Sequence, residues 1–146
     1  FWNIQINDRF PKNKQYNDYL NSIDIMLCPS GGEGWGLPEF QATALGAHSV
    51  VLNCSAYKGW ANEENAILLD PNEEKIPSND GKFFVQGSPF NQGALYTFNK
   101  EPFIEACNKA IERYNNNKIN EAGLKLQSEF TYRNTAEKCI NILKES

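Results

Sequence analysis

The sequence lacks any apolar run long enough to cross a membrane, and its first residues do not combine a charged region with an apolar one as a signal peptide does. It also lacks a basic excess, because 14 Lys and Arg residues stand against 18 Asp and Glu residues and leave a net charge of -4. No basic cluster interleaved with aromatic residues offsets this charge. We therefore expect a cytoplasmic protein with no membrane span and no nucleic-acid partner.

Cysteine and histidine are also scarce, with four cysteines and one histidine. Cys28, Cys54, Cys107 and Cys139 are widely separated and form no C-x-x-C pair. Since three of the four lie in apolar patterns, reduced core thiols are favoured over zinc ligands or disulfides. His48 lies just after a predicted helix end and before a predicted strand, which favours a structural role over acid-base chemistry.

What the sequence does contain is a regular succession of buried elements. Hydrophobic residues make up 40% of the 146 positions, enough for one domain, residues 1–146, with a sizeable core. Continuous apolar runs followed by turn formers predict three buried strands, at Ile25 to Cys28, Val50 to Leu52 and Ile67 to Leu69. We expect these strands to be neighbours in a parallel sheet with helices on both faces, a Rossmann-like three-layer α/β fold.

Amphipathic patterns predict the helices of this fold. They run from Lys12 to Ser22, from Pro38 to Gly46, from Asn99 to Asn115 and from Ile119 to Phe130. The helix after Asn99 is expected to turn inward a face made of Phe103, Cys107, Ala110, Ile111 and Tyr114. A last helix is predicted to have an inward stripe made of Tyr132, Ala136, Cys139, Ile140 and Leu143.

Three other segments have weaker patterns. Trp2 to Ile6 alternates as a short strand, and its abrupt start leads us to expect further sequence upstream. Pro71 to Gly81 is polar and rich in turn formers, which predicts a surface loop. Phe83 to Val85 and Leu95 to Phe98 are candidates for two strands in the insertion that follows.

The chemistry is concentrated in the loop after the first predicted strand, where Gly31, Gly32, Gly34 and Gly36 surround Glu33. Glycines accept positive φ values and let another molecule approach the backbone. The loop contains neither G-x-G-x-x-G nor G-K-[ST], and the Glu33 carboxylate would repel a phosphate placed directly on it. A carboxylate among exposed amides instead suits a polyhydroxylated ligand, because it accepts hydrogen bonds from neighbouring sugar hydroxyls.

Groups around this loop extend the predicted site. Pro38 and Glu39 suit the first turn of a helix, whose positive end is receptive to anions. Gln41, also in the first turns, is placed to reach a ribose diol. Ser55 and Ala56 leave the second predicted strand at the same sheet edge, so we expect them to face the same ligand.

These residues resemble the nucleotide-sugar-binding domain of GT-B glycosyltransferases, in particular the retaining family 4 type. The resemblance covers Asp24 to Ala56. Within it, Asp24 to Ser30, Glu33 to Pro38, Ala42, Ala44 to Gly46, Val50 and Asn53 to Ala56 fall at the family's spacings. A weaker match, Phe130 to Ala136, looks like the aromatic entry to that family's last helix.

The resemblance implies that two glutamates bracket the loop, the first touching the donor sugar and the second the ribose. Glu33 matches the first and is the implied catalytic residue, whereas Gln41 replaces the second and His48 stands where the family usually has proline. The implied binding residues are Gly34, Trp35, Gly36, Leu37, Pro38 and Gln41. Protein groups take the role of a metal in this scheme, so no cofactor is expected.

The implied function is donor binding for retaining transfer of a hexose from a nucleotide-diphosphate sugar to a glycan or lipid acceptor, as in polysaccharide biosynthesis. The acceptor half of a GT-B enzyme would precede Phe1, so we expect the isolated chain to transfer no sugar. A rival interpretation is a non-catalytic α/β binding or regulatory module that kept the fold. Trp35 and Trp60 also have two interpretations, stacking on a sugar or base, or filling space beneath their loops.

Overall fold

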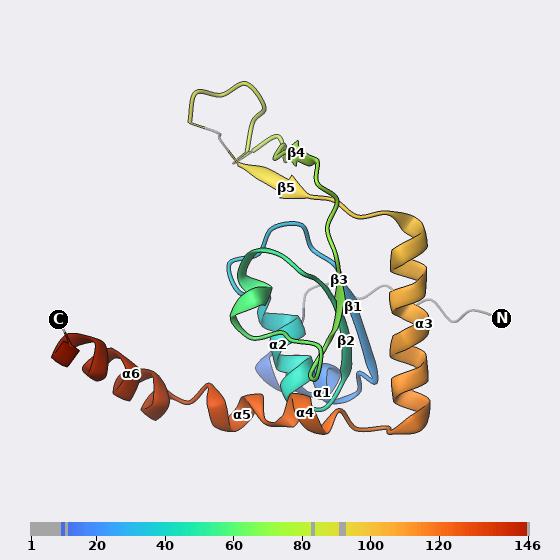
Figure 1. Ribbon diagram of the computed structural model, residues 1–146, viewed down its shortest axis with the longest axis vertical. Coiled ribbons are helices and arrows are strands. Elements are labelled where there is room, and N and C mark those ends of the chain that lie inside the picture. Colours follow the sequence, from blue (N-terminus) through green and yellow to red (C-terminus); the bar gives the residue numbers. More distant parts are fainter. Residues whose placement is uncertain (1–9, 11, 83, 91–92, 146) are drawn as a thin grey trace.

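The computed structural model describes residues 10, 12–82, 84–90 and 93–145, so the strand expected at Trp2 to Ile6 lies outside the described residues. A parallel sheet of β1 (Ile25–Cys28), β2 (His48–Leu52) and β3 (Ile67–Leu69), in that order, forms its centre (Figure 1). Its register pairs Leu27 with Val50 and Val50 with Ile67. The three predicted runs are therefore neighbouring parallel strands, as expected.

Helices cover both faces of this sheet. α3 (Lys100–Asn116) packs along one face, and α2 (Leu37–Ala44) lies on the other (Figure 1). Neighbouring residues of β2 point to opposite faces, so Val50 packs against α3 while Val51 joins a cluster with Ala44 of α2. All five residues of β2 are buried, which explains the continuous apolar run of Val50 to Leu52 within it. The chain is thus an α/β protein with a parallel sheet between helices.

β1 differs from the prediction that it is buried on both faces. Leu27 is 48% exposed, although its register partner Val50 is fully buried. β1 is an edge strand of the described sheet, and α3 packs over Ile25 and Val50 but leaves Leu27 open. Its other face is covered, because α1 (Asn13–Asn21) brings Leu20 into a cluster that Met26 joins.

A second, antiparallel sheet of two strands lies beyond the parallel one. β4 (Lys75–Pro77) pairs with β5 (Ala94–Tyr96), so the prediction of a surface loop from Pro71 to Gly81 is wrong at β4. All of β4 is exposed, and a strand exposed on both faces shows no alternation that sequence could reveal. Phe84 and Val85 form no strand, and Phe83 lies outside the described residues, so only the second of the two predicted strands, at β5, is confirmed.

The C-terminal part also corrects two predictions. The helix expected from Ile119 to Phe130 is divided into α4 (Glu121–Leu124) and α5 (Leu126–Glu129). Asn120 anchors this region, because its side chain donates to the carbonyls of Ala47 and Asn65 and accepts from the Gly123 amide. These bonds fix where α4 starts, which helical periodicity does not encode.

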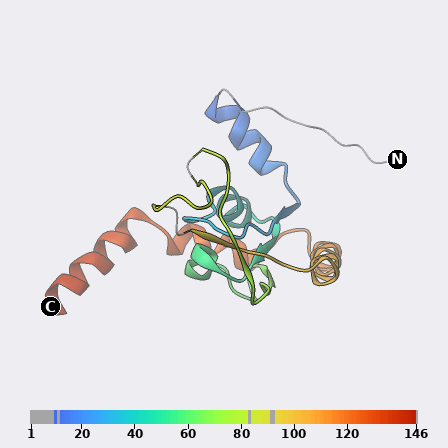
Figure 2. The same ribbon diagram turned by 90° about the horizontal axis from the view of Figure 1, so that it is seen from above.

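α6 (Tyr132–Glu145) has no buried residue, so its predicted inward stripe is wrong. Tyr132 is 97% exposed and Leu143 77% exposed, and α6 projects away from the sheet (Figures 1 and 2). Periodicity predicted an amphipathic helix correctly but carries no information on what covers its apolar face. On α3 the inward face is centred on Ala106 and Ala110, while Ile111 is exposed.

Candidate functional site

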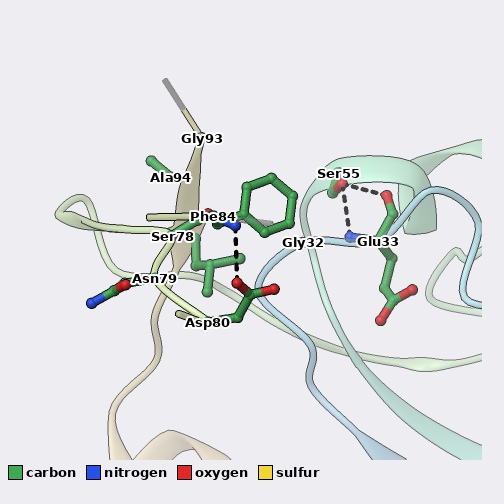
Figure 3. Close-up of a pocket in the computed structure, with 10 residues that line it drawn as sticks. Gly32, Glu33, Ser55, Ser78, Asn79, Asp80, Phe84, Gly93 and Ala94 are labelled. Atoms are coloured by element: carbon green, nitrogen blue, oxygen red, sulfur yellow. Dashed lines mark hydrogen bonds between the residues drawn. The ribbon is translucent and has the colours of Figure 1, made fainter. Parts of the chain in front are cut away.

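A cavity of about 510 Å³ opens at the carboxyl ends of β1 and β2, within the range typical of small-molecule sites (Figure 3). The glycine loop after β1 and a short 3-10 helix after β2, η1 (Ser55–Gly59), form one side. The described residues of the β4–β5 hairpin, 75–82, 84–90 and 93–96, form the other side. The cavity is lined by Gly32, Glu33, Ser55, Ser78, Asn79, Asp80, Phe84, Gly93, Ala94 and Leu95.

Ser55 fastens the glycine loop to η1. Its hydroxyl donates to the Glu33 carbonyl at 2.8 Å and accepts from the Glu33 amide at 3.3 Å (Figure 3). Ser55 has a φ of 52°, a left-handed conformation that costs a non-glycine residue on the order of 1 kcal/mol. Ser55 thus lines the same cavity as Glu33, whereas Ala56, expected beside it, is not among the lining residues.

Two glycines of the loop make room for the chain's own hairpin. A Cβ added at Gly31 would overlap the Tyr96 carbonyl oxygen, and the Tyr96 amide donates to the Gly31 carbonyl at 3.0 Å. A Cβ at Gly32 would lie 2.9 Å from Leu95 Cδ2. The sequence prediction that all four glycines admit another molecule is therefore wrong for these two, because β5 takes that space.

Of the other two glycines, Gly36 is also enclosed by the protein's own side chains, whereas Gly34 is open. Gly36 has a φ of 73°, and a Cβ there would overlap the Tyr57 ring and lie 3.0 Å from Glu39 Oε2. Gly34 has no neighbouring atom within 4 Å of an added Cβ. Open approach to the loop backbone is therefore concentrated at Gly34, directly beside Glu33.

The charge of the cavity is negative. Glu33 and Asp80 contribute carboxylates, and none of the lining residues is Lys, Arg or His. Asp80 Oδ1 accepts from the amides of Lys82 and Phe84, which fixes the backbone beside the Phe84 ring (Figure 3). Glu33 itself is half-buried. This lining attracts hydroxyl and amide donors and opposes anions.

The predicted binding residues after Glu33 do not all face this cavity. The Trp35 ring packs edge-on against Phe40 and Phe130, and its carbonyl accepts from Trp60 Nε1 at 3.0 Å. Trp60 is 4% exposed. Trp60 therefore fills space beneath its loop, the second of the two interpretations drawn from the sequence, whereas Trp35 is half-buried and lines a separate hollow of about 650 Å³ with Phe40 and Phe130. Leu37, at the start of α2, is 58% exposed.

Gln41 lies on another side of α2. Its Oε1 accepts from the Tyr16 hydroxyl of α1 at 2.9 Å, which leaves Nε2 and the second lone pair of Oε1 for other partners. It lines a separate hollow of about 390 Å³ with residues of α1 and α5, among them Leu20 and Leu126. The structure thus does not bring Gln41 and Glu33 into one cavity.

Glu39 is a feature that sequence reasoning missed. It was expected only to complement the first turn of α2, yet it is 3% exposed and its Oε2 has no hydrogen-bond partner among the described residues. The positive end of α2 helps to stabilise such a carboxylate. Burial, and then Glu39, raise the pKa of the Cys28 thiol to about 12, and burial and Glu39 also raise the pKa of Tyr57.

His48 lies at the opposite end of the sheet from the glycine loop, because it pairs with Ile25 at the start of β1. It is 5% exposed, and its Nε2 donates to the Asn117 carbonyl at 2.8 Å. This placement agrees with the structural role predicted from its sequence context.

The hairpin residues of the cavity were not predicted. Asn79, Asp80 and Phe84 come from segments whose sequence indicated a loop or a strand and nothing about a site. The turn formers of Pro71 to Gly81 predicted a surface loop, but no pattern indicated that this segment would lie beside the glycine loop. That contact is long-range and depends on the Gly31–Tyr96 packing.

No protein-family model and no curated protein matches this chain. Within the described residues, no helix combines the length and apolar character needed to cross a bilayer. Among those same residues, no group of three or more His, Cys, Asp or Glu side chains is placed to hold a metal ion.

Proposed function

We propose that this chain is the donor-binding domain of a retaining glycosyltransferase of the GT-B type and that it binds a nucleotide-diphosphate sugar. The observation that carries the proposal is the half-buried Glu33 beside the open backbone of Gly34, at the carboxyl edge of a parallel α/β sheet. Ligands of open α/β sheets bind at this edge.

In this proposal the Glu33 carboxylate accepts hydrogen bonds from hydroxyls of the donor sugar. The amides of Gly34 and Trp35 donate to no acceptor among the described residues, so they are available to the ligand. The exposed start of α2 at Leu37 and Pro38 stabilises the diphosphate leaving group with its positive end. Gln41 binds ribose through Nε2 and the second lone pair of Oε1, because Tyr16 uses only one lone pair of that oxygen.

One observation favours a second candidate, a non-catalytic binding module with the same fold. Gln41 carries no charge, and its carbonyl oxygen is already used by Tyr16 rather than presented to the cavity of Glu33. A module of this kind would bind neutral ligands at the cavity without high affinity for a nucleotide.

Calorimetric titration with a panel of uridine, guanosine and adenosine diphosphate sugars tests the proposal. We expect Glu33→Ala to weaken binding by roughly tenfold or more, because hydrogen bonds to a charged group contribute about 1.5–3 kcal/mol. The free energy of unfolding should change by less than about 0.5 kcal/mol. Glu137→Ala, at an exposed position of α6, is the matched control and should leave affinity unchanged.

Gln41→Glu separates the two candidates. A ribose bonded to a charged acceptor gains about 1 kcal/mol, so the donor-domain proposal expects roughly fivefold tighter binding. The binding-module candidate expects no gain. Unchanged affinity in both Glu33→Ala and Gln41→Glu would show that this loop is not a donor site.

A further inference from the structure

The carboxylate of Glu39 lies buried at the start of α2. Its Oε2 atom is 3.0 Å from the position that a Cβ would take at Gly36, the residue that precedes the helix. This oxygen has no hydrogen-bond partner among the described residues, and Glu39 is only 3% exposed. Because an ionised group without a partner is unfavourable in a protein interior, this carboxylate is sensitive to any charge placed beside it.

The ionisable groups around Glu39 do not neutralise it. Its carboxylate acts electrostatically on three neighbours, which are Tyr16 of α1, Cys28 of β1 and Tyr57 of η1, and Glu33 acts on the last two. Burial, and then Glu39, raise the pKa values of all three neighbours, so they are uncharged near pH 7. No lysine or arginine among the described residues forms an ion pair with Glu39. Glu39 is therefore the buried group of this cluster that can change its charge near pH 7.

The start of α2 presents backbone donors that no side chain caps. Gly36 occupies the N-cap position, and no side-chain hydrogen bond is made there. The first N–H groups of a helix have no intrahelical acceptor, which applies here to the amides of Leu37 and Glu39, since Pro38 has no N–H. The positive end of a helix attracts anions, but the Glu39 carboxylate lies in the same turn and offsets part of this attraction.

We propose that Glu39 couples the binding of a diphosphate at the start of α2 to the uptake of a proton. A diphosphate bonded to the first-turn amides brings negative charge next to a buried carboxylate that has no partner. Glu39 removes this repulsion when it accepts a proton from solvent and becomes a neutral carboxylic acid. The inference rests on the proposed function in placing the diphosphate of the donor at this helix end. Its consequence is that Glu39 limits the affinity for the donor, and that this affinity falls as the pH rises.

Calorimetric titration of the whole chain with nucleotide-diphosphate sugars, in two buffers of different ionisation enthalpy, measures the proton uptake. Both phosphates of such a donor stay ionised near pH 7, so the proton goes to the protein. We expect uptake of part of a proton per ligand in the unaltered chain and none in Glu39→Gln. At pH 8 the same variant should bind these ligands about tenfold more tightly. Glu137→Gln makes the same charge change at an exposed position of α6 and should behave as the unaltered chain does.

Two further probes separate an effect of charge from a change in the shape of the site. Inorganic pyrophosphate carries the charge without the nucleoside or the sugar, and uridine carries no charge. We expect Glu39→Gln to tighten pyrophosphate binding and to leave uridine binding, followed by NMR, within about twofold. Amide NMR spectra report whether each variant keeps the fold. A change of equal size for uridine and pyrophosphate would overturn the inference, because charge would then not be the cause.

The inference and the proposed function can fail separately. Nucleotide sugars that bind without proton uptake, and equally well to Glu39→Gln and to the unaltered chain, would overturn the inference and leave the donor-domain proposal supported. Pyrophosphate binding that Glu39→Gln tightens, in a chain that binds no nucleotide sugar, would support the inference and refute the donor-domain proposal. Pyrophosphate that binds to neither chain would overturn the inference whatever the result with nucleotide sugars.

Discussion

The parallel sheet and the β4–β5 hairpin meet at one cavity but are stabilised by different interactions. β2 is buried along its whole length and contributes side chains to both faces of the core. β4 is exposed along its whole length and is held by backbone pairing with β5 and by the contact of Tyr96 with Gly31. The sheet is thus stabilised by apolar burial, whereas the hairpin depends on backbone hydrogen bonds and one close approach.

This difference assigns a separate task to each region. The sheet fixes the positions of Glu33 and Ser55 through the ends of β1 and β2, which burial makes rigid. The hairpin adds Asn79 and Phe84 to the lining of the cavity, and neither belongs to the buried core. Binding groups carried by loops on a stable scaffold are a common arrangement in proteins. Substitutions in the two regions should therefore have separable effects on stability and on binding.

The largest effect is expected from a core truncation in the sheet. Leu52→Ala removes a fully buried side chain from β2 and should lower the free energy of unfolding by about 2–5 kcal/mol. Ile76→Ala, in the 49% exposed position at the centre of β4, should cost less than about 1 kcal/mol. Urea unfolding at pH 7 measures both. Equal costs would mean that the hairpin is as much a part of the core as β2.

An intermediate effect is expected where the two regions touch. Gly31→Ala places a methyl group on the Tyr96 carbonyl, so the hairpin must shift, at a cost of about 1–3 kcal/mol. Gly34→Ala is the control, because its added methyl group meets no atom within 4 Å and should leave stability unchanged. Chemical-shift changes should extend along β5 in the first variant only. A stable Gly31→Ala chain with an unshifted β5 would contradict the packing described here.

The same difference explains how much of the molecule the sequence predicted. Val50 to Leu52 was recognisable as a strand because burial on both faces demands a continuous apolar run. β4 was missed because neither of its faces is buried, and the pairing that defines it is with a segment about twenty residues away. The apolar stripe of α6 was recognisable in the sequence. Its exposure to solvent was not, because periodicity describes one face of a helix and not what packs against it.

Only the part of the candidate site that directly follows β1 and β2 could be predicted from the sequence. Glu33 and Ser55 follow strands whose ends must meet at one edge, so their proximity followed from the parallel topology. The position of Phe84 in the cavity lining and the burial of Glu39 depend on long-range packing that no local motif reports. Gln41 was expected to share a ligand with Glu33, and its position on a helix did not reveal that Tyr16 would bond it first.

The smallest effect is a pH dependence that should come from the sheet region and not from the hairpin. Burial raises the pKa of Cys28, the last residue of β1, from 9.0 to about 12, and the carboxylates of Glu39 and Glu33 act in the same direction. Below pH 9 the thiol is protonated in both the folded and the unfolded chain, so it has no effect there. Above pH 9 the unfolded chain loses this proton while the folded chain keeps it, so stability falls as the pH rises toward 12.

Urea unfolding at pH 8.0, 9.0, 9.5 and 10.0 measures this decline. Cys28→Ala should show a shallower decline than the unaltered chain, because the group that ionises on unfolding is removed. Cys139→Ala is the matched control, since that thiol is exposed on α6, and its decline should equal that of the unaltered chain. Burial also raises the pKa values of Cys54, Cys107 and Tyr57, and these groups contribute the decline that remains in Cys28→Ala. Identical slopes in all three chains would show that the Cys28 thiol is not desolvated at the end of β1, and the alkaline instability would then have to be traced to other groups.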